Sequence, residues 1–119
     1  MEREEIKQIL LKLKFNINSK GFDYWIQAIH IYTTFKNVPM KELYEQLSFE
    51  FNTPKTAVER ALRTASKQAY SNIHKYFNYD GKITNSVILK LFRFYYDITD
   101  FQNHIPHIDY EERNYGEKI

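Results

Sequence analysis

The stretch "NTPKTAVERALRTA", Asn52–Ala65, has the pattern of a helix whose two faces differ sharply. At 100° per residue, the charged and hydroxyl side chains fall within about a third of the circumference, and small or branched apolar side chains lie opposite. The first set is Thr56, Glu59, Arg60, Arg63 and Lys67, and the second is Ala57, Val58, Ala61, Leu62, Ala65 and Ala69. A small-residue face lets a helix pack closely on its neighbours, so the charged face is expected to project outward.

The residues around this helix predict an all-α domain, a compact bundle of about six helices within residues 1–97. Apolar residues recur at three- and four-residue spacing, and the expected helices are 2–14, 22–35, 40–51, 54–70, a short one holding 73–77, and a last one capped by Thr84 or Asn85. Thr53 and Pro54 suit a hydroxyl cap and a proline at the first helical position. With the preceding helix and the turn "FNTP", residues 51–54, this is the pattern of a helix-turn-helix.

Composition limits the classes of protein to be considered. With 119 residues, of which 43% are hydrophobic, the chain suits one folded domain. There is no cysteine, which excludes disulfides and thiolate zinc sites. No stretch approaches the ~18 consecutive apolar residues of a membrane span, and the first residues lack the apolar core of a signal peptide. We therefore expect a soluble, cytoplasmic protein without membrane attachment.

The net charge of +2 conceals a basic middle and an acidic end. Residues 53–75 hold five basic side chains and one acidic one, a balance of 5 − 1 = +4. Residues 100–119 hold two basic and five acidic side chains, a balance of 2 − 5 = −3. Because the helical pattern also dissolves after Asp97, residues 98–119 are predicted to be an acidic, irregular tail.

The charged face of the 54–70 helix has the chemistry to read base edges. Arginine can donate two hydrogen bonds to guanine, and glutamate can accept one from cytosine. Lys55 and Thr56, in the first turn, would lie near phosphates together with the free backbone amides of the helix. The alternative is a solvated face with an intrahelical pair, since Glu59 and Arg63 have the favourable i,i+4 order, worth about 0.2–0.5 kcal/mol. Spacing alone leaves both interpretations open.

Three islands of sequence resemble a known family. They are "LYEQLSFEFNTPKTAVERALRTA" (residues 43–65), "KGFDYWIQAI" (20–29) and "KITNS" (82–86). In their order along the chain, the three islands resemble the C-terminal effector domain of stage-zero sporulation protein A, the response regulator of endospore-forming Firmicutes. The resemblance covers roughly residues 19–96. It implies a bundle of about six helices that binds short promoter elements, often as tandem copies, and activates or represses transcription.

The resemblance also implies roles for individual residues. Glu59, Arg60 and Arg63 correspond to base-reading positions, and Thr56 falls at another position of the recognition helix. Contacts to the DNA backbone are implied for Lys82, Thr84 and Asn85, and the charge pattern adds Lys55 and Lys67.

Some features depart from the family pattern. Thr64 and Ile83 replace the usual side chains, and the connection between Tyr70 and Lys82 is shorter. No receiver domain precedes the module, so we do not expect dimerisation driven by phosphorylation.

These observations lead to two hypotheses. The first is a stand-alone, sequence-specific double-stranded DNA-binding transcriptional regulator, with the 54–70 helix in the major groove and possible homodimer or tandem binding. The alternative, suggested by the acidic tail, is a protein-interaction module that modulates a full-length sporulation-type regulator or another partner. No catalytic set or phosphate loop is evident, and Pro106 separates His104 from His107. We therefore expect no enzyme activity, no cofactor and no metal.

Overall fold

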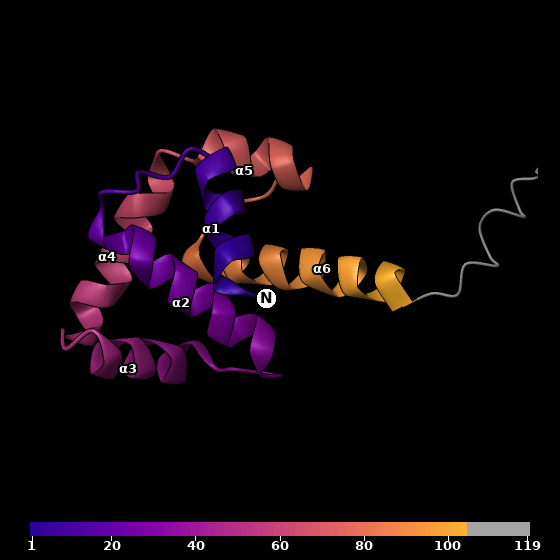
Figure 1. Ribbon diagram of the computed structural model, residues 1–119. Coiled ribbons are helices and arrows are strands. Elements are labelled where there is room, and N and C mark those ends of the chain that lie inside the picture. Colours follow the sequence, from indigo (N-terminus) through magenta and orange to yellow (C-terminus); the bar gives the residue numbers. More distant parts are fainter. Residues whose placement is uncertain (105–119) are drawn as a thin grey trace, which may run out of the picture.

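Six α-helices make up most of the backbone of residues 1–104, the part of the chain that the computed structural model describes (Figure 1). They are α1 (Arg3–Lys12), α2 (Lys20–Thr34), α3 (Met40–Glu50), α4 (Lys55–Lys67), α5 (Tyr70–Phe77) and α6 (Asn85–His104). Residues 1–104 contain no strand. The all-α bundle expected from the sequence is confirmed. Over the same residues, none of the helices is both long and apolar enough to cross a bilayer.

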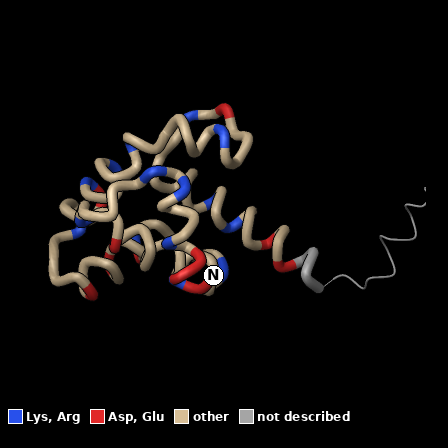
Figure 2. The backbone as a smooth tube through the Cα atoms, turned by 45° about the horizontal axis from the view of Figure 1, so that its top comes forward, with Lys and Arg blue, Asp and Glu red and all other residues tan. Residues whose placement is uncertain are grey.

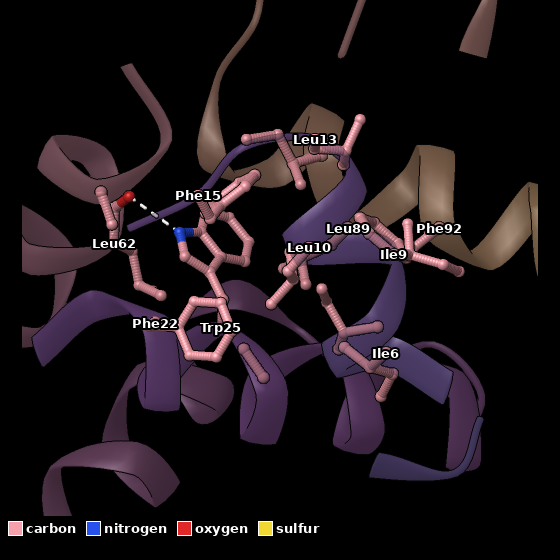
Figure 3. Packing of buried hydrophobic residues seen from close by; sticks show 14 of the residues in the cluster. Ile6, Ile9, Leu10, Leu13, Phe15, Phe22, Trp25, Leu62, Leu89 and Phe92 are labelled. Atoms are coloured by element: carbon pink, nitrogen blue, oxygen red, sulfur yellow. Dashed lines mark hydrogen bonds between the residues drawn. The ribbon is translucent and has the colours of Figure 1, made fainter. Parts of the chain in front are cut away.

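Helix α2 lies at the centre of the bundle, because it packs against α1, α3, α4 and α6. Its apolar face supplies the largest fully buried side chains, Phe22 and Trp25, together with Ile29. Figure 3 shows the rings of Phe22 and Trp25 between Leu62 of α4 and Leu10 of α1. Phe15, which follows α1, meets the Trp25 ring edge-on, with 6.3 Å between the ring centroids. The core therefore surrounds α2, and the other helices are positioned by their contacts with it.

Helix α4 approaches α2 almost to backbone contact. A Cβ atom on Gly21 would stand 2.5 Å from the Cβ of Ala65, and it would also overlap the carbonyl oxygen of Ala61. One helical turn further along, the indole Nε1 of Trp25 donates a hydrogen bond of 2.9 Å to the carbonyl oxygen of Leu62 (Figure 3). The missing side chain at Gly21 and the hydrogen bond of the buried indole together determine how closely α4 approaches α2.

The turn between α3 and α4 depends on a left-handed residue. Asn52 has φ 50°, which only glycine and asparagine adopt readily. The amide of Thr53 donates to the carbonyl of Ser48 at 3.1 Å, and that of Asn52 donates to Phe49 at 3.4 Å. Together they close the last turn of α3.

The start of α4 differs slightly from the sequence prediction. Pro54 precedes the helix as its capping residue, and no side chain caps α4. The expected hydroxyl cap at Thr53, with Pro54 as the first helical residue, is therefore wrong by one position. The reason is that Thr53 belongs to the closure of α3, since its carbonyl also accepts a hydrogen bond of 2.5 Å from the Ser48 hydroxyl.

Helix α6 begins as predicted and ends later than predicted. The hydroxyl oxygen of Thr84 accepts a hydrogen bond of 3.1 Å from the amide of Val87, which confirms the predicted cap. The helix continues past Asp97 to His104, so the expectation of an irregular chain is wrong for residues 98–104. An i,i+4 ion pair between Arg93 and Asp97, at 3.2 Å, supports the helix across the predicted boundary. The rest of the predicted tail, residues 105–119, lies outside the described residues.

We expect Gly21→Ala to lower the free energy of unfolding by about 2 kcal/mol or more, because the new methyl group meets the backbone of α4. Gly81→Ala is the matched control, since its methyl group would meet only the ring and hydroxyl of Tyr79, the end of a flexible side chain. Urea unfolding midpoints of the two variants measure the difference. Equal midpoints would show that α4 can move away from α2 without cost.

Candidate nucleic-acid interface

Helix α4 presents one charged face to solvent. Val58, Leu62 and Ala65 are buried, which fixes the inward side of the helix. The side chains that were predicted to contact DNA from this helix are all exposed: Lys55, Thr56, Glu59, Arg60, Arg63 and Lys67. Figure 2 shows several blue segments, with red ones among them, at the left of the view where α4 lies; other blue segments are spread over the rest of the bundle. The division of α4 into a small, buried face and a charged, open face follows the helical wheel.

Glu59 and Arg63 form the intrahelical ion pair that the spacing allows. Nη1 of Arg63 lies 3.3 Å from Oε2 of Glu59, and the two side chains are 45% and 48% exposed. An exposed i,i+4 pair is worth only about 0.3–0.5 kcal/mol. Both side chains are therefore free to exchange this contact for another partner in front of the helix.

Arg60 differs from Arg63 because it has no hydrogen-bond or ion-pair partner among residues 1–104. It lines a shallow depression of about 310 Å³ with Thr64 and with Ser19 and Lys20 at the start of α2. Its guanidinium group is thus available for a two-hydrogen-bond contact without first breaking an internal one.

The two lysines of α4 stand at opposite ends of the helix. Nζ of Lys55 lies 3.4 Å from Oε2 of Glu45 on α3, with both side chains 48% exposed. Lys67 is in the last turn, where a positive charge also suits the helix dipole. Twelve residues of helix separate them by roughly 18 Å, so they bracket the charged face.

An open groove of about 640 Å³ runs between α4 and the segment that leads into α6. Glu59 and Arg63 lie on one wall and Lys82 and Thr84 on the other, with Tyr44 also contributing. Lys82 and Thr84 are exposed. The structure therefore brings the predicted backbone-contacting segment beside the charged face of α4, although 17 residues lie between the end of α4 at Lys67 and the start of α6 at Asn85.

Asn85 lies on the same segment but faces inward. It is 9% exposed, and its side-chain amide donates to the hydroxyl oxygen of Tyr44 at 3.2 Å and to the carbonyl of Glu59 at 3.3 Å. In this structure the side-chain amide is used inside the domain, and the predicted contact to phosphate stays a prediction. In this arrangement the backbone amide of Asn85, at the start of α6, is suited to an anion.

Tyr44 was not predicted as part of the site, although "LY" at residues 43–44 belongs to the family resemblance. Burial raises the pKa of the Tyr44 phenol, and the hydrogen bond from Asn85 opposes that shift. The phenol is therefore neutral at ordinary pH, and its own proton can still be donated toward the groove.

No group of three or more histidine, aspartate and glutamate side chains within residues 1–104 could hold a metal ion.

Comparison with known families decides the identity of the domain. The model of the family described as "Sporulation initiation factor Spo0A C terminal" matches residues 6–93. The chain belongs to this family. The match includes α1, which the sequence islands did not reach, and it ends within α6.

The family consists of DNA-binding effector domains of transcription factors rather than enzymes, so this chain is a DNA-binding domain of the Spo0A C-terminal family. No curated protein and no solved structure matches the chain significantly.

We expect Asn85→Ala to lower the free energy of unfolding by about 1–3 kcal/mol, because the hydroxyl of Tyr44 and the carbonyl of Glu59 lose a buried donor. Urea unfolding measures this effect, and salt titration of duplex binding measures any contact to phosphate. Unchanged stability together with a smaller salt dependence would show that the side chain turns outward to the DNA backbone instead.

Proposed function

We propose that this chain is a sequence-specific, double-stranded DNA-binding transcriptional regulator, and that α3, the turn at residues 51–54 and α4 act as a helix-turn-helix. The observation that carries the proposal is the exposed charged face of α4, held outward by the close packing of its other face on α2. A helix presented in this way fits the major groove of B-DNA. Because DNA is the ligand, the protein would act in the bacterial cytoplasm.

The residues proposed to read bases lie in the middle of α4. Arg60 and Arg63 each have the fork of donors that matches the O6 and N7 atoms of guanine, and Glu59 can accept from the amino group of cytosine. Thr56 lies one turn earlier on the same face and can contact a base or a phosphate. The pair between Glu59 and Arg63 would hold both side chains in place in the free protein and open at little cost on binding.

The residues proposed to contact the DNA backbone lie on both sides of the base-reading residues of α4. Lys55 and Lys67 stand at the ends of α4, and Lys82 and Thr84 stand across the groove at the start of α6. The start of α6, where the helix dipole is positive, belongs to the same segment as Lys82 and Thr84. Phosphate contacts on two sides of α4 would fix its register in the major groove.

Arg60→Ala should weaken binding to the preferred duplex by about 1–3 kcal/mol and reduce the preference over random duplex, because a two-hydrogen-bond contact to a base is lost. The preferred duplex is first selected from a random pool, and fluorescence anisotropy then measures both affinities. Lys12→Ala, an exposed cation on α1, is the control and should change neither affinity. Equal losses on preferred and random duplex would contradict direct readout by Arg60.

Lys82→Ala should weaken binding to every duplex alike and lower the slope of log K against log salt by about 0.9, the value for one phosphate contact. Titrations of the variant and the parent protein on the same two duplexes, at several salt concentrations, give this slope. If the slope is unchanged, Lys82 does not contact the DNA backbone.

Exposed aromatic side chains favour a second function, as a module that binds a full-length sporulation-type regulator or another protein. Phe49 on α3 is 82% exposed and Phe94 on α6 is 63% exposed, and solvent-facing aromatic side chains are frequent at protein contacts. This function would be preferred if the intact protein selects no duplex from a random pool at low salt.

A further inference from the structure

The shallow depression that Arg60 lines has an apolar floor and a basic rim. Apart from Arg60, every side chain that α4 contributes to it is small: those of Ala57, Ala61, Thr64 and Ala65. Gly21 of α2 contributes no side chain and is buried, whereas Arg60 and Lys20 are exposed. No acidic side chain of residues 1–104 lines the depression. A ligand that fits here therefore has a small apolar group and carries negative charge nearby.

The close packing of α2 on α4 places the two cations of the rim beside each other. Gly21 approaches α4 so closely that a Cβ atom on it would overlap the carbonyl oxygen of Ala61. Lys20, the residue before Gly21, is thereby held next to α4 although it is far from Arg60 in the sequence. The depression is thus a product of the fold, which explains why the sequence pattern did not predict it.

Neither cation of the rim is used inside the domain. Lys20 and Arg60 have no hydrogen-bond or ion-pair partner among residues 1–104. By contrast, Lys55 and Arg63 are each paired with a glutamate. The hydroxyl of Ser19, which also lines the depression, donates a hydrogen bond of 2.9 Å to the carbonyl of Asn16. The polar contacts that the depression offers to a ligand therefore come mainly from two positive charges, which suit the DNA backbone.

The major groove of DNA carries one small apolar group, the 5-methyl group of thymine, and threonine and alanine methyl groups are its usual partners. Thr64 lies four residues after Arg60 on α4, and Ala57 lies three residues before it. These spacings correspond to about 6 Å and 4.5 Å along the helix, whereas base pairs are about 3.4 Å apart. If Arg60 reads a guanine, the depression lies within about two base pairs of it.

We propose that this depression receives the methyl group of a thymine within about two base pairs of the guanine read by Arg60, while Lys20 binds a phosphate of the DNA backbone beside it. Thr64 is then a specificity-determining residue, because its methyl group contacts that of the thymine. Thr64 departs from the family pattern, so this preference belongs to this chain in particular. The inference rests on the proposed function, since it requires α4 to lie in the major groove.

Replacement of thymine by deoxyuridine tests the contact, because it removes only the methyl group from the duplex. The preferred duplex is selected from a random pool, and the guanine is located as the position where Arg60→Ala loses discrimination. Each nearby thymine is then replaced in turn, and fluorescence anisotropy measures affinity. One replacement should weaken binding about fourfold, the effect of one buried methyl group. A duplex without a thymine near this guanine, or one in which no replacement matters, would overturn the proposal.

Two variants of Thr64 separate its methyl group from its hydroxyl. Thr64→Ser keeps the hydroxyl and should remove most of the deoxyuridine effect, whereas Thr64→Val keeps a methyl group and should retain that effect. Thr34→Ser is the matched control, because it removes the same methyl group from an exposed residue at the other end of α2. An effect that persists in Thr64→Ser, or that is lost in Thr64→Val, would contradict the role of the Thr64 methyl group.

Lys20→Ala should lower the slope of log K against log salt by about 0.9 on every duplex and leave the deoxyuridine effect unchanged. Lys12→Ala again serves as the control, and an unchanged slope in Lys20→Ala would overturn the phosphate contact. If Arg60→Ala weakens binding as proposed and no deoxyuridine matters, the thymine contact alone fails. If the chain selects no duplex at all, the function proposed for α4 and this inference fail together.

Discussion

The contact between α2 and α4 determines which face of α4 is open to solvent. Gly21 removes the side chain that would otherwise keep the two helices apart, and the Trp25 indole bonds to a backbone carbonyl of α4 within the core. Both features act on the buried side of α4, where small residues allow the close approach. The charged side of α4 is therefore exposed because the opposite side packs closely on α2. If the packing at Gly21 changed, every side chain on the outer face would be displaced together.

Buried polar contacts fix the other boundary of the interface. Asn85 joins the start of α6 to the phenol of Tyr44 on α3 and to the backbone of α4. Behind the charged face, three helices are thus held by directional bonds in a region of low exposure. In front of it, the ion pairs of Glu59 and Lys55 are single, exposed and weak. This contrast gives a firmly held support with side chains that can rearrange, which suits the proposed binding to DNA.

The sequence predicted the parts of the fold that depend on local periodicity. The charged face of α4, the helix order and the Thr84 cap each follow from spacing within a few residues. The inward direction of Asn85 did not, because its partners lie 26 and 41 residues away and no local pattern reports them. The role of Gly21 was hidden for the same reason. Helix α6 was predicted too short because aspartate and threonine after Tyr96 weaken the apolar pattern, whereas the Arg93–Asp97 pair supports the helix there.

Trp25 is the only tryptophan of the chain, and its place against α4 gives the protein a built-in optical probe. The emission of an indole depends on the polarity around it and on the partner of its N–H group. Here the ring is fully buried, and the N–H group donates its hydrogen bond to the backbone of α4 itself. The ten tyrosines can pass excitation to it. The tryptophan fluorescence of the protein thus originates at the single contact between α2 and α4, and unlabelled protein can report in real time whether α4 stays packed against α2.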